Sequence, residues 1–431
     1  MNELLITNVR IVDENYDENK TMQVLVSEGK IAKIAENIDA KTEKTIDGQG
    51  FLLMPGLIDM SCKICEAGFE NNSNIVTVSE SAAAGGFTTL CCSPKTQPCI
   101  DTKSVVEYIS SKVKDFSGVN IRLYGSITKE CAGEEIAEMG EMIDRGVIAL
   151  SDGGTSIHNA SILRHVMIYS RMFGIPLITR CADRDLCGSG CINRGYYSTK
   201  LGLKGCPPEG EDSIVSRNLI LAKYSQAKLH LTKISTAGSV HHIQDAKKRG
   251  VKATADTCPQ YFTKSECEAE NYNTIAKVDP PLRTKDDINA IIEGLRDGTI
   301  DVISSGHTPA TVETKDMEFE NASYGISSLE TALMVSFTAL VKNNDFTPLD
   351  IVKKMSCNPA NILGLNTKGR IAEGMDADLI IVDDKNYYKI NSENFLSRAK
   401  YSLYDGEELC GKTVATVCGG KVLFENISIQ S

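Results

Sequence analysis

Hydrophobic positions follow two different periods through the middle of the chain. Short apolar runs such as FTTLCC (87–92), GVIALSD (146–152) and KLHLTKIS (228–235) have the length of buried strands, whereas SVVEYISSKVKD (104–115) and SILRHVMIYSRMF (161–173) have helical spacing. About eight strand–helix units follow one another in this way, the number that closes a (β/α)₈ barrel. The pattern therefore predicts an α/β fold with a TIM-type barrel over residues 54–365, with its chemistry at the C-terminal ends of the strands.

Both ends of the chain have a strand-like pattern without intervening helices. Residues 1–53 and 366–431 contain short runs rich in branched residues, separated by turns at Glu28-Gly29, Asp47-Gly48 and Gly419-Gly420. Two such ends flanking one long middle segment predict a small composite β-sandwich domain beside the barrel.

Composition limits the classes of partner and the compartment. The chain has 431 residues, 42% of them hydrophobic, and a formal net charge of -11, which argues against a nucleic acid or an anionic membrane surface as a partner. No run of about 18 apolar residues and no basic, then apolar, leader is visible, so we expect a cytoplasmic protein. The 15 cysteines are spread over a long chain, and most should therefore be reduced thiols.

Several segments carry a resemblance to a known family. In chain order they are PGLIDM (55–60), GGFTTLCCSPKTQP (85–98), ISTAGSV (234–240), DPPLR (279–283), GHTP (306–309), GISSLETAL (325–333), NPANILGL (358–365) and KGRIAEGMDADLIIVD (368–383). Together they resemble the class I dihydroorotases, in the cyclic amidohydrolase branch of the amidohydrolase superfamily. The resemblance covers nearly the whole chain.

The resemblance implies a zinc site whose bound hydroxide attacks a cyclic amide, but this sequence departs from the family at the residues concerned. The family's metal-ligand and catalytic positions fall on Ser61, Lys63, Gly153, Arg180, Lys233 and Gly306, the last in place of the catalytic aspartate. Its substrate-binding positions fall on Cys65, Lys95 and Asp279. The chain has six histidines, and none is at a ligand position. We therefore expect the family zinc to be absent and no catalytic residue of the family to be intact.

The replacements form a candidate cation cluster of Lys63, Lys95, Arg180 and Lys233. One hypothesis is structural: the cations pair with Asp59, Glu66, Asp152 or Asp183 and hold the strand ends together. Another is that they bind a small anion such as a carboxylate or phosphate. A neutral lysine acting as nucleophile or base, and a thiolate metal site built from Cys62, Cys65, Cys91, Cys92 and Cys181, remain alternatives.

These observations predict a dihydroorotase-like protein that is catalytically inactive and has a scaffolding or regulatory role linked to pyrimidine biosynthesis. By family resemblance the expected partners are a second copy in a homodimer, an aspartate transcarbamoylase-like protein and a small anionic ligand. The alternative is an active hydrolase of a cyclic amide that uses a metal-free or unorthodox mechanism.

Overall fold

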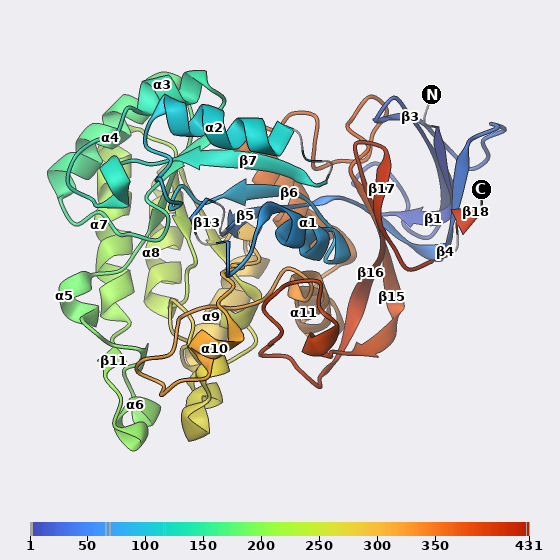
Figure 1. Ribbon diagram of the computed structural model, residues 1–431. Helices are drawn as coiled ribbons and strands as arrows, with labels where there is room; N and C mark the ends of the chain where they lie inside the picture. Colours follow the sequence, from blue (N-terminus) through green and yellow to red (C-terminus); the bar gives the residue numbers. More distant parts are fainter. Residues whose placement is uncertain are drawn as a thin grey trace.

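The computed structural model describes residues 3–64, 67–68, 70–114, 116, 118–427 and 429–430. Figure 1 shows a barrel surrounded by helices and, beside it, a β domain that carries both chain termini. The predicted fold is therefore confirmed. Within the described residues, no helix is long and apolar enough to cross a membrane.

Eight parallel strands form the barrel, in the order β14-β13-β12-β9-β8-β7-β6-β5. They are β5 (Leu57–Cys62), β6 (Phe87–Cys92), β7 (Asn120–Gly125), β8 (Ala149–Ser151), β9 (Leu177–Arg180), β12 (Leu229–Thr232), β13 (Ala253–Thr257) and β14 (Val302–Ile303). Most of their residues are buried on both faces, which is why they appear in the sequence as continuous apolar runs. The interior is filled by side chains that include Ile58, Met60, Cys91, Tyr124 and Ile178.

The first and last barrel strands are joined just beyond their C-terminal ends. The backbone N–H of Lys63 donates to the carbonyl of His307 at 3.0 Å. The backbone N–H of Ser305 donates to Asp59 Oδ1 at 2.9 Å, and the Ser305 hydroxyl donates to the other carboxylate oxygen. These bonds connect the β5 end to the β14 end.

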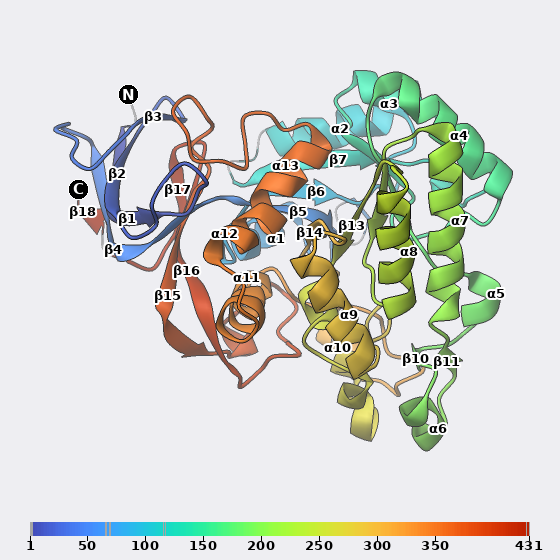
Figure 2. The ribbon, with the colours of Figure 1, turned by 180° about the vertical axis from the view of Figure 1, so that it is seen from behind.

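Helices cover the outside of the barrel (Figure 2). They are α1 (Ile75–Ala84), α2 (Lys103–Lys114), α3 (Met139–Asp144), α4 (Ala160–Phe173), α7 (Glu209–Ser225), α8 (Ala237–Lys248), α9 (Lys285–Arg296), α11 (Ala332–Ser336), α12 (Pro348–Val352) and α13 (Asn358–Leu363), with the short α10 (Val312–Lys315) in the loop after β14. Local signals fix their ends: the Asn159 side chain caps α4, and Gly174 ends it in the left-handed conformation.

Between β9 and α7 the chain makes an excursion away from the barrel. It contains α5 (Arg184–Cys187), β10 (Ile192–Asn193), α6 (Tyr196–Leu201) and β11 (Gly205–Cys206), and β10 pairs with β11. We call residues 183–208 the excursion below; α6 and β11 lie at the lower end of the molecule in Figure 1.

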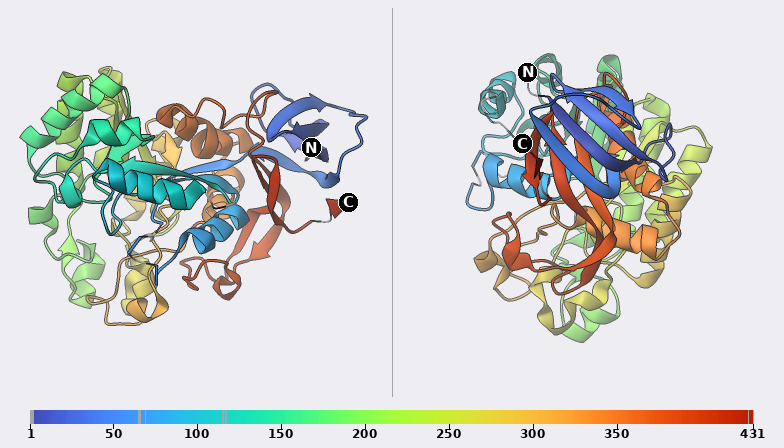
Figure 3. Two further views of the ribbon diagram at one scale, coloured as in Figure 1. Left: turned by 45° about the horizontal axis from the view of Figure 1, so that its top comes forward. Right: turned by 90° about the vertical axis from the view of Figure 1, so that its right-hand side faces the viewer.

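The β domain is one mixed sheet of eight strands drawn from both ends of the chain. Its strands are β1 (Leu4–Ile11), β2 (Thr21–Ser27), β3 (Lys30–Ala35), β4 (Lys44–Pro55), β15 (Leu379–Lys389), β16 (Glu408–Cys418), β17 (Lys421–Glu425) and β18 (Ile429–Gln430). The N-terminal and C-terminal halves meet where β4 pairs with β15 in antiparallel register. Figure 3 shows the bend of the sheet and its position beside the barrel.

Candidate functional site

A cavity of about 400 Å³ lies at the C-terminal ends of the barrel strands. We call it the mouth. Its wall includes all four residues of the candidate cation cluster, namely Lys63, Lys95, Arg180 and Lys233. Ser61, Gly153, Gly306 and Asp279 line it as well. Cys65, the remaining candidate position, lies outside the described residues.

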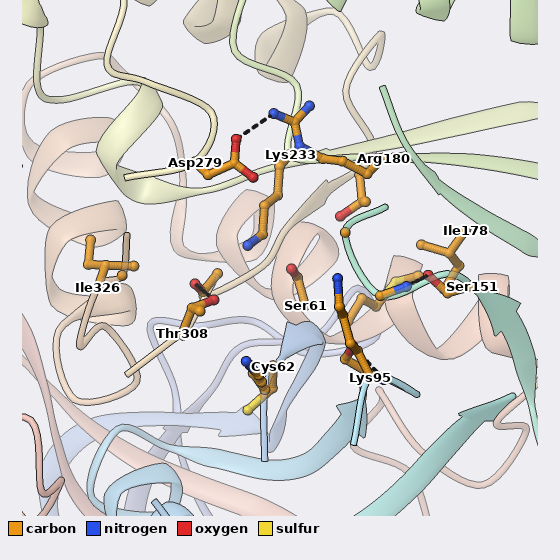
Figure 4. A pocket seen from close by; sticks show the side chains of 18 of the residues that line it. Ser61, Cys62, Lys95, Ser151, Ile178, Arg180, Lys233, Asp279, Thr308 and Ile326 are labelled. Carbon is orange, nitrogen blue, oxygen red and sulfur yellow. Dashed lines mark hydrogen bonds and ion pairs between the residues drawn. The ribbon is translucent and has the colours of Figure 1, made fainter. Parts of the chain in front are cut away.

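The strand ends explain why these residues meet. Arg180 is the last residue of β9, Lys233 follows β12 and Lys95 lies in the loop after β6. Figure 4 shows the amines of Lys95 and Lys233 directed toward the centre of the mouth, with Ser61 between them. Lys233 adopts a left-handed backbone conformation (φ 58°), and its N–H donates to buried Asp256 at 2.9 Å, which fixes the turn.

Arg180 forms an ion pair with Asp279, one of the expected substrate-binding positions. The Arg180 Nη2 atom lies 3.0 Å from Asp279 Oδ1 (Figure 4). Burial would raise the pKa of the Asp279 carboxyl, but the nearby Arg180 and Lys233 outweigh it and hold that pKa below its ordinary value. The Arg180 side chain is only 5% exposed, whereas that of Asp279 is 54% exposed toward the open cavity.

The acids that the sequence suggested as partners of the cations are engaged elsewhere, and for the described ones that hypothesis is wrong. Asp59 bonds to Ser305, and Asp183 caps α5. Asp152 accepts from the backbone N–H groups of Ile127 and Thr128, both at 2.9 Å. The fourth acid, Glu66, lies outside the described residues. The carboxylates of Asp59, Asp152 and Asp183 accept hydrogen bonds from nearby backbone and hydroxyl groups of the protein, and within the described part of the chain they form no ion pair with the cations of the mouth.

The pKa values of these strand-end acids and of Asp279 are shifted in opposite directions, although burial acts in the same direction on all three carboxyls. For Asp59 and Asp152 it raises the pKa above the ordinary value, and the hydrogen bonds that they accept only partly offset this. Asp59 and Asp152 are buried, whereas the Asp279 side chain is partly exposed at the open mouth.

Gly153 and Gly306 occupy positions of the mouth where a side chain would collide with its neighbours. At Gly153 (φ 56°) a Cβ atom would lie 2.6 Å from Ser93 Oγ and 2.8 Å from Lys95 Cβ. At Gly306 (φ 68°) it would lie 2.7 Å from Cys258 Sγ. A side chain at either position would need a rearrangement of its neighbours, because such contacts are closer than atoms normally approach.

Burial favours the neutral forms of the Cys91 thiol and the His307 imidazole beside the mouth. Burial raises the pKa of Cys91 to about 12, which opposes the thiolate that metal binding needs. Burial, with a smaller contribution from Lys233, lowers the pKa of His307 to about 3. His307 Nδ1 accepts from the backbone of Ser328 at 3.2 Å. His230 is fully buried against Asp256, with 2.9 Å between Nε2 and Oδ2.

Family models and full-length relatives identify the chain. A dihydro-orotase-like model matches residues 50–239, and an amidohydrolase family model matches residues 215–423. A dihydroorotase of Acetivibrio thermocellus is 41% identical over 420 residues, covering 97% of this chain and 98% of that protein. A dihydroorotase of Caldicellulosiruptor saccharolyticus is 42% identical over 422 residues, with coverages of 97% and 98%. The chain belongs to the dihydroorotase family.

Solved structures of hydantoinases share the architecture of this dihydroorotase-family chain. The L-hydantoinase (dihydropyrimidinase) of Arthrobacter aurescens superposes with a TM-score of 0.89 at 25% identity, covering 100% of this chain and 98% of that one. A dihydropyrimidinase of Brevibacillus agri gives a TM-score of 0.84 at 20% identity, covering 98% and 95%. Both combine the barrel with a β domain.

Sequence reasoning missed Thr232 and Gln260, two polar residues in the wall of the mouth. Thr232 Oγ1, Gln260 Oε1 and Arg180 Nε are buried and have no hydrogen-bond partner among the described residues, and all three residues line the mouth. Gln260 follows β13 and resembles no motif, so only its place after a strand end could have suggested it. Buried polar groups normally have hydrogen-bond partners, so these three atoms are exceptions in the wall of the mouth.

Proposed function

We propose that the mouth of this dihydroorotase-family amidohydrolase binds a small carboxylate or phosphate anion through Lys95, Arg180 and Lys233. In this proposal the protein has a scaffolding or regulatory role linked to pyrimidine biosynthesis, without zinc-dependent hydrolysis. The observation that carries it is the convergence of these three cations on one cavity, where only Arg180 has a carboxylate within salt-bridge distance among the described residues. Guanidinium and ammonium groups facing a cavity are suited to carboxylate and phosphate.

The residues around the mouth do not fit the zinc of the family. Zinc is held by thiolate, imidazole and carboxylate ligands. Among the described lining residues the only carboxylate is that of Asp279, which is paired with Arg180, and no histidine is present. The two thiols are those of Cys62 and Cys91, and burial opposes ionisation of Cys91. A dication placed here would also be repelled by Lys95 and Lys233. Ser61, Gly153 and Gly306 fall on metal-ligand or catalytic positions of the family. Of the three, only Ser61 has a side-chain oxygen that could bind a metal.

A second candidate function is supported by the comparisons. Identities of 41% and 42% over 97% of the chain relate it to proteins named dihydroorotase. That relation favours an active hydrolase of dihydroorotate or a related cyclic amide. With these residues the mechanism would be metal-free or unorthodox.

One experiment separates the two functions. Purified protein is assayed for dihydroorotate hydrolysis after chelation and after addition of Zn²⁺, and is titrated calorimetrically with phosphate and with succinate. The Lys233→Gln variant is compared with Lys223→Gln, a change at an exposed lysine of α7. We expect no turnover, saturable anion binding, and loss of that binding by about tenfold or more in Lys233→Gln only. Turnover that Lys233→Gln abolishes and Lys223→Gln preserves would instead establish the hydrolase.

A further inference from the structure

A second cavity adjoins the mouth on its Arg180 side. It has a volume of about 270 Å³ and shares Arg180, Asp279 and Tyr324 with the wall of the mouth. Two cysteines of the excursion, Cys187 and Cys206, line this second cavity. Neither residue belongs to a position that the family resemblance assigns to metal or substrate.

The fold holds these two cysteines together although 18 residues separate them in the chain. Cys187 is the last residue of α5 and Cys206 is the last residue of β11, and both side chains line the same cavity. A Cβ atom at Gly210 would lie 2.7 Å from Cys187 Sγ, so a glycine is needed to leave room for this sulfur. Both are free thiols in the structure.

Nearby cations favour a thiolate at Cys206. The Cys187 hydrogen bond, followed by Arg283 and Arg180, lowers the pKa of Cys206 to about 7, against the opposing effect of burial. Arg283 is fixed beside it, because its Nη1 donates to the Cys206 carbonyl at 2.9 Å and to Asn193 Oδ1 at 2.8 Å. A cysteine in a cavity lined by two arginines and by a second thiol has the environment of a reactive residue.

We propose that Cys187 and Cys206 form a redox modification site that exchanges with low-molecular-weight disulfides such as glutathione disulfide. The Cys206 thiolate attacks one sulfur of the reagent, forming a mixed disulfide and releasing one glutathione thiolate. Cys187 then loses its proton and attacks the Cys206 sulfur, forming the Cys187–Cys206 bond and releasing the second glutathione. The protein is oxidised by two electrons and the reagent is reduced to two thiols. This site does not depend on the proposed anion binding.

A second pair of cysteines provides an internal control. Cys99 and Cys131 have their sulfur atoms 3.3 Å apart. Cys206 and Cys131 are 6% and 2% exposed, but the Cys131 sulfur also contacts Ser126 Oγ at 3.3 Å, which in turn donates to Asp152. Cys131 therefore belongs to a buried hydrogen-bond network, whereas Cys187 and Cys206 line a cavity, so we expect a disulfide reagent to react with the cavity pair first.

The test is peptide mapping of the intact protein. It is equilibrated with glutathione and glutathione disulfide at several ratios, quenched by alkylation and analysed by mass spectrometry. We expect a Cys187–Cys206 cross-link that forms before any Cys99–Cys131 cross-link, is reversed by dithiothreitol, and forms at a rate that is half-maximal near the Cys206 pKa of about 7.

Variants identify the attacking thiol. In Cys187→Ser the resolving thiol is missing, so glutathione should remain bound to Cys206. In Cys206→Ser the modification of Cys187 should be slower by about tenfold or more. The double change Cys99→Ser with Cys131→Ser should leave the Cys187–Cys206 bond unaffected. The proposal fails if the folded wild-type protein forms no such bond, or if all its cysteines react at one common rate that tracks unfolding.

Discussion

Charged groups have different partners in the mouth of the barrel and in the layer of strand-end carboxylates around it. Asp59 and Asp152 are buried and accept hydrogen bonds from the protein's own backbone and hydroxyl groups. Lys95 and Lys233 direct their amines into the open cavity (Figure 4). The acid layer is satisfied by the fold itself, whereas the mouth still has capacity for a ligand. Stability and binding should therefore respond to different substitutions.

The largest loss of stability is expected for Asp152→Ala. This change leaves the backbone N–H groups of Ile127 and Thr128 and the hydroxyls of Ser126 and Thr128 without their acceptor in a buried place. We expect a loss of about 3 kcal/mol in the free energy of unfolding, measured by urea denaturation. The matched control is Asp183→Ala, which removes the cap of α5 and should cost only about 1 kcal/mol. Equal losses in the two variants would contradict the distinction.

Gly153→Asp should destabilise the protein by about 2 kcal/mol, because the new Cβ meets Ser93 Oγ at 2.6 Å and Lys95 Cβ at 2.8 Å. Gly154→Asp is the control: its φ is also positive, but no atom lies within 4 Å of the added Cβ. A second change, Ser93→Gly, should restore part of the lost stability in Gly153→Asp and none in Gly154→Asp. Thermal unfolding measures all four proteins, and rescue of both variants would show that contact with Ser93 is not the cause.

Asp279→Asn should cost about 1–2 kcal/mol at neutral pH. It leaves buried Arg180 without its carboxylate, and the loss is below that of a fully buried pair because Asp279 is 54% exposed. The folded-state pKa of Asp279 lies below 3.8, so its stabilisation is present above pH 3.8 and is lost as pH falls through the folded pKa. The difference between wild type and variant should therefore vanish in strong acid.

The strand-end acids should show the opposite pH dependence. The folded-state pKa values of Asp59 and Asp152 are raised above 3.8, so the stability linked to their protons is fully present below pH 3.8 and is lost as pH rises through the folded values. The melting temperature of wild type and Asp279→Asn, followed from about pH 7 down to about pH 2, separates the two contributions. If the difference in melting temperature between Asp279→Asn and wild type stayed constant over this pH range, that would argue against the Arg180–Asp279 pair.

Sequence patterns predicted the fold and which residues meet, because both follow from strand order. A residue that follows a barrel strand must lie at the C-terminal face, which is how Lys95, Arg180 and Lys233 could be placed together. Their partners could not be predicted in this way. Asp59 lies in β5 and Asp152 directly follows β8, but both carboxylates accept hydrogen bonds from backbone N–H groups, whereas Asp279 comes from the long segment between β13 and β14. The proximity of Cys187 and Cys206 depends on how the excursion folds back on itself, and the hydrophobic periodicity of the sequence does not predict that path.

The smallest effect on stability is expected for Lys95→Ala, a change that tests the mouth alone. Lys95 is exposed, and its amine reaches Thr155 Oγ1 at 3.3 Å, a bond that water can replace. Its removal should therefore change the free energy of unfolding by less than about 0.5 kcal/mol.

Removing one of three cations from an anion site should nevertheless weaken phosphate or succinate binding by about tenfold, equivalent to about 1.4 kcal/mol. Calorimetric titration at low and high salt measures this loss, which should shrink as salt screens the amine. If Lys95→Ala lowered stability as much as Asp152→Ala does, the amine would be part of the structural network, and the separation between the mouth and the acid layer would be wrong.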